Sequence, residues 1–260
     1  MKILPVVKSN NYMLPLAERC KSSWDYWHPD IPMHIVNLEQ WQPYTDFLHQ
    51  TPKYGNQPMA IGLFYAILKM MTEGYDLLIH IDADTVITGR CDEMFTDDYD
   101  IGVSKCWYHD PDPPYYNAGI WTSRDLDFIK DFYYAHNLPI EDNNLFMIVE
   151  SWYGSIYSKN KTIKVLDEHG SGVWYNQCSG AWWGRLKIID NELWTVDDID
   201  SRRIKILHWA SGCKANEVKM SCSLFSDEVK QWLNKITKST DFTDYDGKDY
   251  GDFLTRTYKL

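Results

Sequence analysis

An unbroken apolar run from Asp76 to Ile81, Asp-Leu-Leu-Ile-His-Ile, most restricts the fold of this 260-residue chain. Runs of this kind form strands that are covered on both faces, as in parallel sheets. Residues 57–73 carry apolar side chains at helical spacing, and Gly74 follows as a helix stop. Ile3–Val7 and His34–Leu38 predict two earlier strands. This alternation predicts an α/β sheet that binds ligands beyond the carboxyl ends of its strands.

The later part of the chain alternates less regularly. Its apolar runs predict strands at residues 100–105, 118–122, 163–166 and 204–209. Its helical spacing predicts helices at residues 126–135, 144–157 and 226–238. An acidic tail with few aliphatic residues begins at Asp241, and we expect it to be peripheral.

Two carboxylates follow the apolar run directly, in the order Asp82, Ala83, Asp84. Residues i and i+2 of an extended chain share one side, so both carboxylates can face one cation. Mg²⁺ and Mn²⁺ bind carboxylate oxygens and leave positions open for substrate phosphates. Two solvated acids at a strand end are the alternative, and the position after a buried strand favours the metal site.

A second polar group follows the strand-like run at residues 204–209. His208 ends the run, Gly212 gives a turn, and Lys214 adds a positive charge. A neutral imidazole could complete the metal shell, and mixed oxygen and nitrogen ligands favour Mn²⁺ over Mg²⁺. Gly212 would let backbone approach a phosphate, and Lys214 could bind a diphosphate. The alternatives are a hydrogen-bonded structural histidine and a solvated lysine.

Charge and composition exclude several classes of partner. With 26 basic and 37 acidic residues the net charge is −11, which argues against nucleic acid and anionic membranes as partners. The apolar stretches are too short for a signal-peptide core or a membrane span, and the six cysteines form no CxxC pair. We therefore expect a cytoplasmic protein with free thiols. The 12 Trp, 18 Tyr and 9 Phe suit a core, an interface or sugar rings equally well.

Four motifs in order resemble those of GT-A glycosyltransferases, with the nearest likeness to glycogenin and the bacterial lipopolysaccharide galactosyltransferases. Leu78–Thr85, followed by Asp92-Glu93-Met94-Phe95, resembles their Asp-x-Asp segment. Tyr116–Ile120 resembles their Asn-Ser/Ala-Gly motif, and His208–Lys214 resembles their late His-Phe-x-Gly-x-x-Lys motif. Ser9–Tyr12 is similar to the turn whose tyrosine stacks on uracil.

The resemblance covers about residues 3–214 and implies a single α/β domain of GT-A fold. Such a domain is Rossmann-like, with a mixed central sheet and helices on both faces. We expect this domain at residues 1–225, with a nucleotide-sugar-binding half at 1–105 and an acceptor-binding half at 106–225. Residues 226–260 would form a C-terminal helix and the acidic tail.

The resemblance also implies a metal-dependent glycosyltransferase that moves a hexose or pentose with retention from a nucleoside diphosphate sugar to a glycan or glycoprotein. Mn²⁺ or Mg²⁺ would be the cofactor, and UDP is favoured over GDP. The implied metal ligands are Asp82, Asp84 and His208. The implied nucleotide-binding residues are Tyr12, Asp82, Ala83, Asp84, Gly212 and Lys214. The implied donor-sugar and acceptor residues are Asn117, Ala118, Gly119, Asp142 and Trp174.

Asp142 and Asn117 are the candidate catalytic residues. Asp142 follows Glu141 ahead of a predicted helix, so either acid could instead cap that helix. Two other functions compete with sugar transfer. One is a HAD-type phosphatase with Asp82 as the nucleophile, although that motif usually lies on the first strand. The other is a non-catalytic carbohydrate-binding protein, for which a nucleotide-type α/β half is surplus.

Overall fold

The computed structural model describes residues 1–11, 13–41, 57–105, 116–137, 161–166, 173–175, 186–196, 201–208 and 225–239. The chain forms two compact units that interleave along the sequence. The first unit comprises residues 1–14, 33–82 and 92–166, and the second comprises residues 15–32, 83–91 and 167–260. The expected division between residues 105 and 106, into donor and acceptor halves, stays a prediction.

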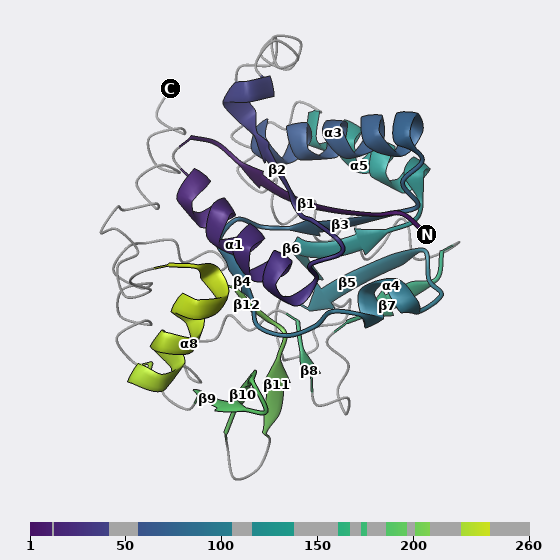
Figure 1. Ribbon diagram of the computed structural model, residues 1–260. Coiled ribbons are helices and arrows are strands. Elements are labelled where there is room, and N and C mark those ends of the chain that lie inside the picture. The colour runs from purple at the N-terminus through teal and green to yellow at the C-terminus, as the bar shows by residue number, and fades with distance from the viewer. Residues whose placement is uncertain are drawn as a thin grey trace, which may run out of the picture. The chain divides into compact units, whose positions relative to one another are not determined.

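A six-stranded mixed sheet forms the first unit (Figure 1). Its strands, in spatial order, are β2 (His34–Asn37), β1 (Ile3–Ser9), β3 (Leu77–Ile81), β6 (Tyr116–Ser123), β5 (Ile101–Lys105) and β7 (Ile163–Val165). β1 is parallel to β2 and β3, whereas β6 is antiparallel to both β3 and β5. β5 is parallel to β7. The expectation of a mixed central sheet is therefore confirmed.

Two helices of the first unit, α3 (Gln57–Glu73) and α5 (Leu126–Asn137), pack against each other and against the sheet (Figure 1). The rings of Phe64 and Tyr133 meet between them, with centroids 6.1 Å apart. Trp121 of β6 is fully buried, with Phe128 and Phe132 edge-on to its ring. This member of the aromatic excess therefore belongs to the core.

The apolar run that predicted a doubly covered strand is confirmed, because all five residues of β3 are buried. Helix α3 has the predicted bounds, and Gly74 follows it with φ +68°, a left-handed conformation that favours glycine. β2 ends one residue earlier than predicted, and a 3₁₀ turn follows it at Leu38–Trp41. A one-turn helix, α4, spans Glu93–Thr96. The helix predicted at 144–157 and the tail from Asp241 lie outside the described residues.

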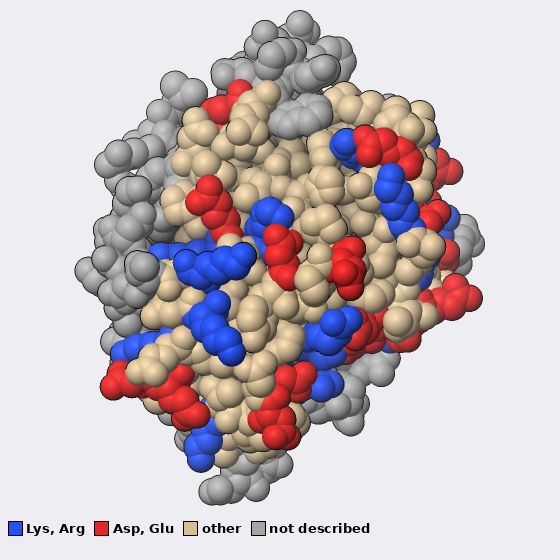
Figure 2. Space-filling view, in the orientation of Figure 1, with Lys and Arg blue, Asp and Glu red and all other residues tan. Residues whose placement is uncertain are grey.

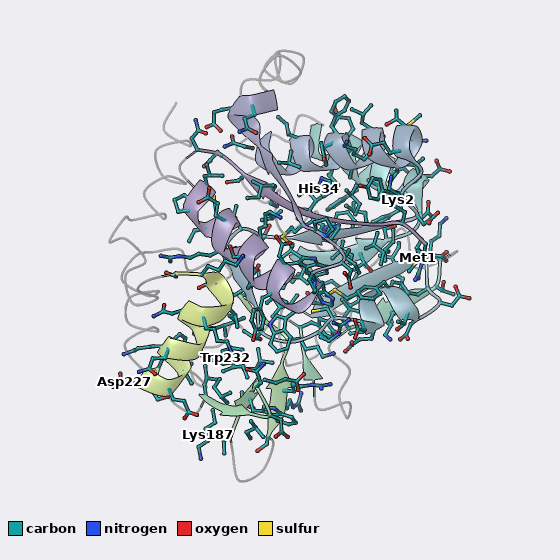
Figure 3. The ribbon with its side chains drawn as sticks, viewed as in Figure 1. Met1, Lys2, His34, Lys187, Asp227 and Trp232 are labelled. Atoms are coloured by element: carbon teal, nitrogen blue, oxygen red, sulfur yellow. The ribbon has the colours of Figure 1, made fainter. Side chains whose placement is uncertain are left out.

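His34, at the start of β2, lies beside helix α3 (Figure 3). Its Nδ1 atom is 2.7 Å from the Tyr65 hydroxyl. Burial raises the pKa of Tyr65, which keeps that hydroxyl neutral and able to share the proton with the imidazole. This contact links the first residue of strand β2 to helix α3, which packs against it.

Among its described residues, the second unit has two small sheets and two helices. Its elements are α1 (Leu14–Trp27), β4 (Thr85–Ile87), β8 (Val173–Trp174), β9 (Leu186–Ile189), β10 (Glu192–Thr195), β11 (Arg202–Ile204), β12 (Ile206–His208) and α8 (Asp227–Thr237). β12 pairs antiparallel with β4, and the other four strands have the order β8-β11-β10-β9. α8 contacts β9, and Trp232 of α8, marked in Figure 3, donates its indole N–H to Asn191 at 3.1 Å.

The strand predicted at Ile204–Trp209 is divided at Lys205 into β11 and β12, which belong to different sheets. Thr88 explains the break, because its N–H donates to the Lys205 carbonyl at 2.8 Å and its hydroxyl to the Ile204 carbonyl at 2.6 Å. Thr88, the residue after β4, thus satisfies two backbone carbonyls where the chain changes sheets.

One face of the molecule carries charges of both signs. On the face drawn in Figure 2, Lys and Arg side chains are interspersed with Asp and Glu. Within the described ranges, no helix combines the length and apolar character needed to cross a bilayer.

Candidate metal and nucleotide site

Asp82 is positioned by the first unit, directly after the buried strand β3. Its backbone N–H donates to the Gly119 carbonyl at 2.7 Å. Its carboxylate Oδ1 lies 2.8 Å from the Lys8 ammonium, and the Asp82 side chain keeps 25% of its surface exposed. Asp82 therefore combines a held backbone with a carboxylate that solvent and ligands can reach.

The Asn117-Ala118-Gly119 segment lies beside Asp82 because the pairing of β5 and β6 is irregular there. Val103 pairs with Trp121, but the next residue, Ser104, pairs with Asn117. The Asn117 side-chain oxygen accepts the Gly119 N–H at 2.6 Å. A Cβ atom at Gly119 would lie 2.8 Å from Cγ of Asp82, so any larger residue here would have to displace that carboxylate. The bulge thus fixes a small residue against the first carboxylate of the motif.

Asp84 and His208 are brought together by the second unit. Asp84 lies in the turn before β4, and β12 pairs with β4 so that His208 is opposite Thr85. The His208 Nε2 atom is 3.3 Å from Asp84 Oδ1. Asp84 is 8% exposed and His208 is 2% exposed. The antiparallel pairing, rather than any sequence proximity, therefore delivers an imidazole to the second carboxylate.

Asp82, Asp84 and His208 each offer one ligand atom, and these atoms all lie within 4.8 Å of one another. Two carboxylate oxygens and one imidazole nitrogen are a donor set that suits Mn²⁺ or Mg²⁺. The residues predicted to ligate a metal therefore form a group with suitable chemistry and spacing.

Some of the remaining predicted site residues lie among the described residues and others do not. Tyr12, Asp142, Gly212 and Lys214 lie outside the described residues, so their roles stay predictions. Ala83 is buried in the turn between β3 and β4, between the two carboxylates. Ala118 lies in β6 and Trp174 in β8, and their roles toward substrate also stay predictions.

Lys8 is the residue of this site that sequence patterns did not indicate. It lies in β1, and the register of β1 on β3 pairs Val7 with Ile81, so Lys8 and Asp82 follow as neighbours on adjacent strands. Only the pairing of two segments far apart in the chain reveals this contact. A lysine just after the apolar run Ile3–Val7 was the available signal, but nothing in it specified a carboxylate partner.

Beyond the carboxyl ends of β1 and β2, side chains brace the turn that resembles a uracil-binding segment. Asn10 Oδ1 accepts the Met13 N–H at 2.8 Å. The Asn11 N–H donates to Glu39 at 2.9 Å, and Asn11 Oδ1 accepts from Asn37 at 2.9 Å. Hydrogen bonds therefore join this turn to the end of β2. In open α/β sheets, nucleotides bind beyond the carboxyl ends of the strands.

Comparison with known proteins places the fold. No protein-family model matches the chain, and no curated protein matches it in sequence. Two crystal structures of the glycosyltransferase GlyE from Streptococcus pneumoniae are 13% identical, with TM-scores of 0.49 and 0.51, and cover 92% and 93% of this chain. The galactosyltransferase LgtC, in complex with donor and acceptor sugar analogues, is 13% identical with a TM-score of 0.44, covering 91% of this chain and 94% of its own.

The chain spans 65% and 64% of the length of the two GlyE structures. At 13% identity, the apo-form GlyE structure with its TM-score of 0.51 establishes the fold and nothing finer. The mixed sheet order described above agrees with that likeness. The chain therefore has the GT-A fold of glycosyltransferases of known structure.

Proposed function

We propose that the protein is a metal-dependent glycosyltransferase that moves a sugar from a nucleoside diphosphate sugar, with UDP favoured over GDP, to a glycan or glycoprotein. The observation that carries this proposal is the group Asp82, Asp84 and His208, whose ligand atoms lie within 4.8 Å of one another. The GT-A fold supports it, because Asp82 and Asp84 follow the carboxyl end of β3, and α/β proteins bind nucleotides beyond the carboxyl ends of their strands.

Asp82, Asp84 and His208 would hold the cation, with Mn²⁺ preferred for its mixed ligands. A cation held there would supply Lewis-acid and electrostatic stabilisation for the negative charge that develops on a leaving diphosphate. Lys214 would add a second positive charge, and Gly212 would let backbone approach the phosphates. Tyr12 would stack on the base, next to the braced turn at the end of β1.

The donor sugar would lie against the Asn117–Gly119 bulge. The Asp82 carboxylate occupies the place where a side chain at residue 119 would lie, and the Asn117 side-chain oxygen accepts the Gly119 N–H. Trp174 would contact the acceptor. The family likeness favours retention with attack on the front face, which needs no carboxylate base. Asp142 is the candidate that would act on the reacting sugar, with a helix-capping role as its alternative.

The direct test is release of UDP or GDP from a panel of nucleotide sugars, with and without Mn²⁺. We expect release to stop with EDTA and to fall by about 10²-fold or more in Asp84→Asn, because a charge-stabilising ligand is lost. Asp76→Asn is a matched control, because it makes the same change just before the start of β3, away from Asp84. There the Asp76 carboxylate accepts a hydrogen bond from the Lys2 backbone N–H. Release of inorganic phosphate instead, or activity that survives both EDTA and Asp84→Asn, would reject the proposal.

A further inference from the structure

The contact between Lys8 and Asp82 places a positive charge on a carboxylate that we assign to a divalent cation. The Lys8 Nζ atom is 2.8 Å from Asp82 Oδ1, and the Lys8 side chain is 15% exposed. Helix α3 lies close to the start of this side chain, because a Cβ atom added at Gly62 would be 3.4 Å from the Lys8 Cβ atom. The register of β1 on β3, which pairs Val7 with Ile81, brings Lys8 to this carboxylate.

A free divalent cation and the Lys8 ammonium compete for the negative charge of the same carboxylate. The two carboxylates carry two negative charges, and a neutral His208 adds none. Lys8 offsets one of these charges, so a divalent cation that binds alone leaves the group with an excess positive charge. The diphosphate of a nucleotide sugar removes that excess and gives the displaced ammonium a new partner.

We propose that Lys8 makes metal binding and nucleotide binding interdependent: its ammonium opposes the free cation at Asp82 and supports the cation–diphosphate pair. This inference rests on the proposed function. Lys8 would act on the binding of ligands and not on the chemical step, so that the nucleotide sugar and the metal bind together. Coupling of this kind is reciprocal, so the metal must raise nucleotide affinity by the same factor as the nucleotide raises metal affinity.

The test measures two affinities of the full chain, with wild type, Lys8→Met and Lys8→Arg compared. Titration with Mn²⁺ alone, followed by electron paramagnetic resonance of free Mn²⁺, should show about tenfold tighter binding in Lys8→Met, equal to about 1.4 kcal/mol. Calorimetry with UDP at saturating Mn²⁺ should show about tenfold weaker binding in the same variant. Lys8→Arg should stay near wild type in both, since it keeps the charge.

Lys69→Met is the matched control, because Lys69 also forms an ion pair, with Glu73 near the end of α3, and its loss removes the same charge. It should move neither affinity. The opposite signs expected for Lys8→Met separate coupling from structural damage, which would weaken both ligands.

Unchanged Mn²⁺ affinity in Lys8→Met, or weaker binding of both ligands, would overturn this inference. The proposed function would still stand if the wild type binds Mn²⁺ and UDP. A wild type that binds neither ligand would instead overturn the proposed function, and this inference with it.

Discussion

Substitution of Gly119 by alanine should displace a metal ligand without unfolding the protein. The added Cβ atom would lie 2.8 Å from Asp82 Cγ and 2.9 Å from Asn117 Oδ1, whereas ordinary contact begins at 3.4 Å. Asp82 Oδ2 would lie closer still, so the Asp82 carboxyl group must move by more than about 0.6 Å, the difference between 3.4 and 2.8 Å at its Cγ atom. The backbone N–H of Asp82 remains tied to the Gly119 carbonyl, so the side chain has to rotate.

The cost should fall on metal affinity more than on stability. Overpacking a buried site costs about 1–3 kcal/mol, and the lower end applies because the nearest obstruction, the Asp82 carboxylate, is a partly exposed side-chain end that can turn. Disturbing the residues that orient a metal ligand weakens metal binding by about 10- to 100-fold. We therefore expect Gly119→Ala to lose about 1 kcal/mol in the free energy of unfolding and at least tenfold in Mn²⁺ affinity.

Gly102→Ala provides the matched control in the neighbouring strand. Its Cβ atom would lie 2.5 Å from the Thr122 hydroxyl oxygen and 3.0 Å from a ring carbon of Tyr99, both buried. The Tyr99 hydroxyl also contacts Thr122 at 2.9 Å, so neither side chain can turn without losing a buried hydrogen bond.

Gly102→Ala should therefore unfold more easily, by about 2–3 kcal/mol, with Mn²⁺ affinity unchanged at a temperature where it is folded. Urea unfolding and Mn²⁺ titration of both variants check the pair. If Gly119→Ala binds Mn²⁺ as tightly as wild type, Asp82 is not held in place by this contact and the reasoning fails.

Three further predictions address single contacts. His208→Ala should weaken Mn²⁺ binding while its circular dichroism spectrum stays that of wild type, and wild-type Mn²⁺ affinity would make the histidine structural. Hydrogen bonds from the Thr162 N–H and hydroxyl hold the pKa of Asp100 below its usual range, so Asp100 stabilises the fold above its unfolded pKa of about 4. Stability should therefore fall as pH drops through the lower folded pKa, and Asp100→Asn should lose part of that dependence in urea titrations from pH 2 to 6. Ser226→Ala removes the oxygen that caps α8 at the Val229 N–H, and should cost about 1 kcal/mol in urea unfolding.

Local patterns predicted the elements that carry their own signal. Strand β3, helix α3 and helix α8 could be recognised from the sequence. Their signals are an apolar run, helical spacing and residues that end a helix, and each of these signals lies within the segment itself. Helix α1 was missed although its buried Leu16, Cys20 and Trp24 recur at helical spacing. The β9–β10 hairpin was also missed; its turn residues Asp190 and Asn191 both have positive φ, a recognised hairpin signal.

The candidate site was predictable only as far as its ligands follow strand ends. Asp82 and Asp84 were identified because a buried strand delivers them, and His208 because a motif resembles one in a known family. Lys8 was not, because its contact with Asp82 depends on which strands pair and in what register. In the function proposed above, the charge of Lys8 would help an acidic chain to hold a diphosphate. If the ammonium opposes the free cation, the site stays poorly loaded with metal until a nucleotide arrives, which is a property that no ligand motif describes.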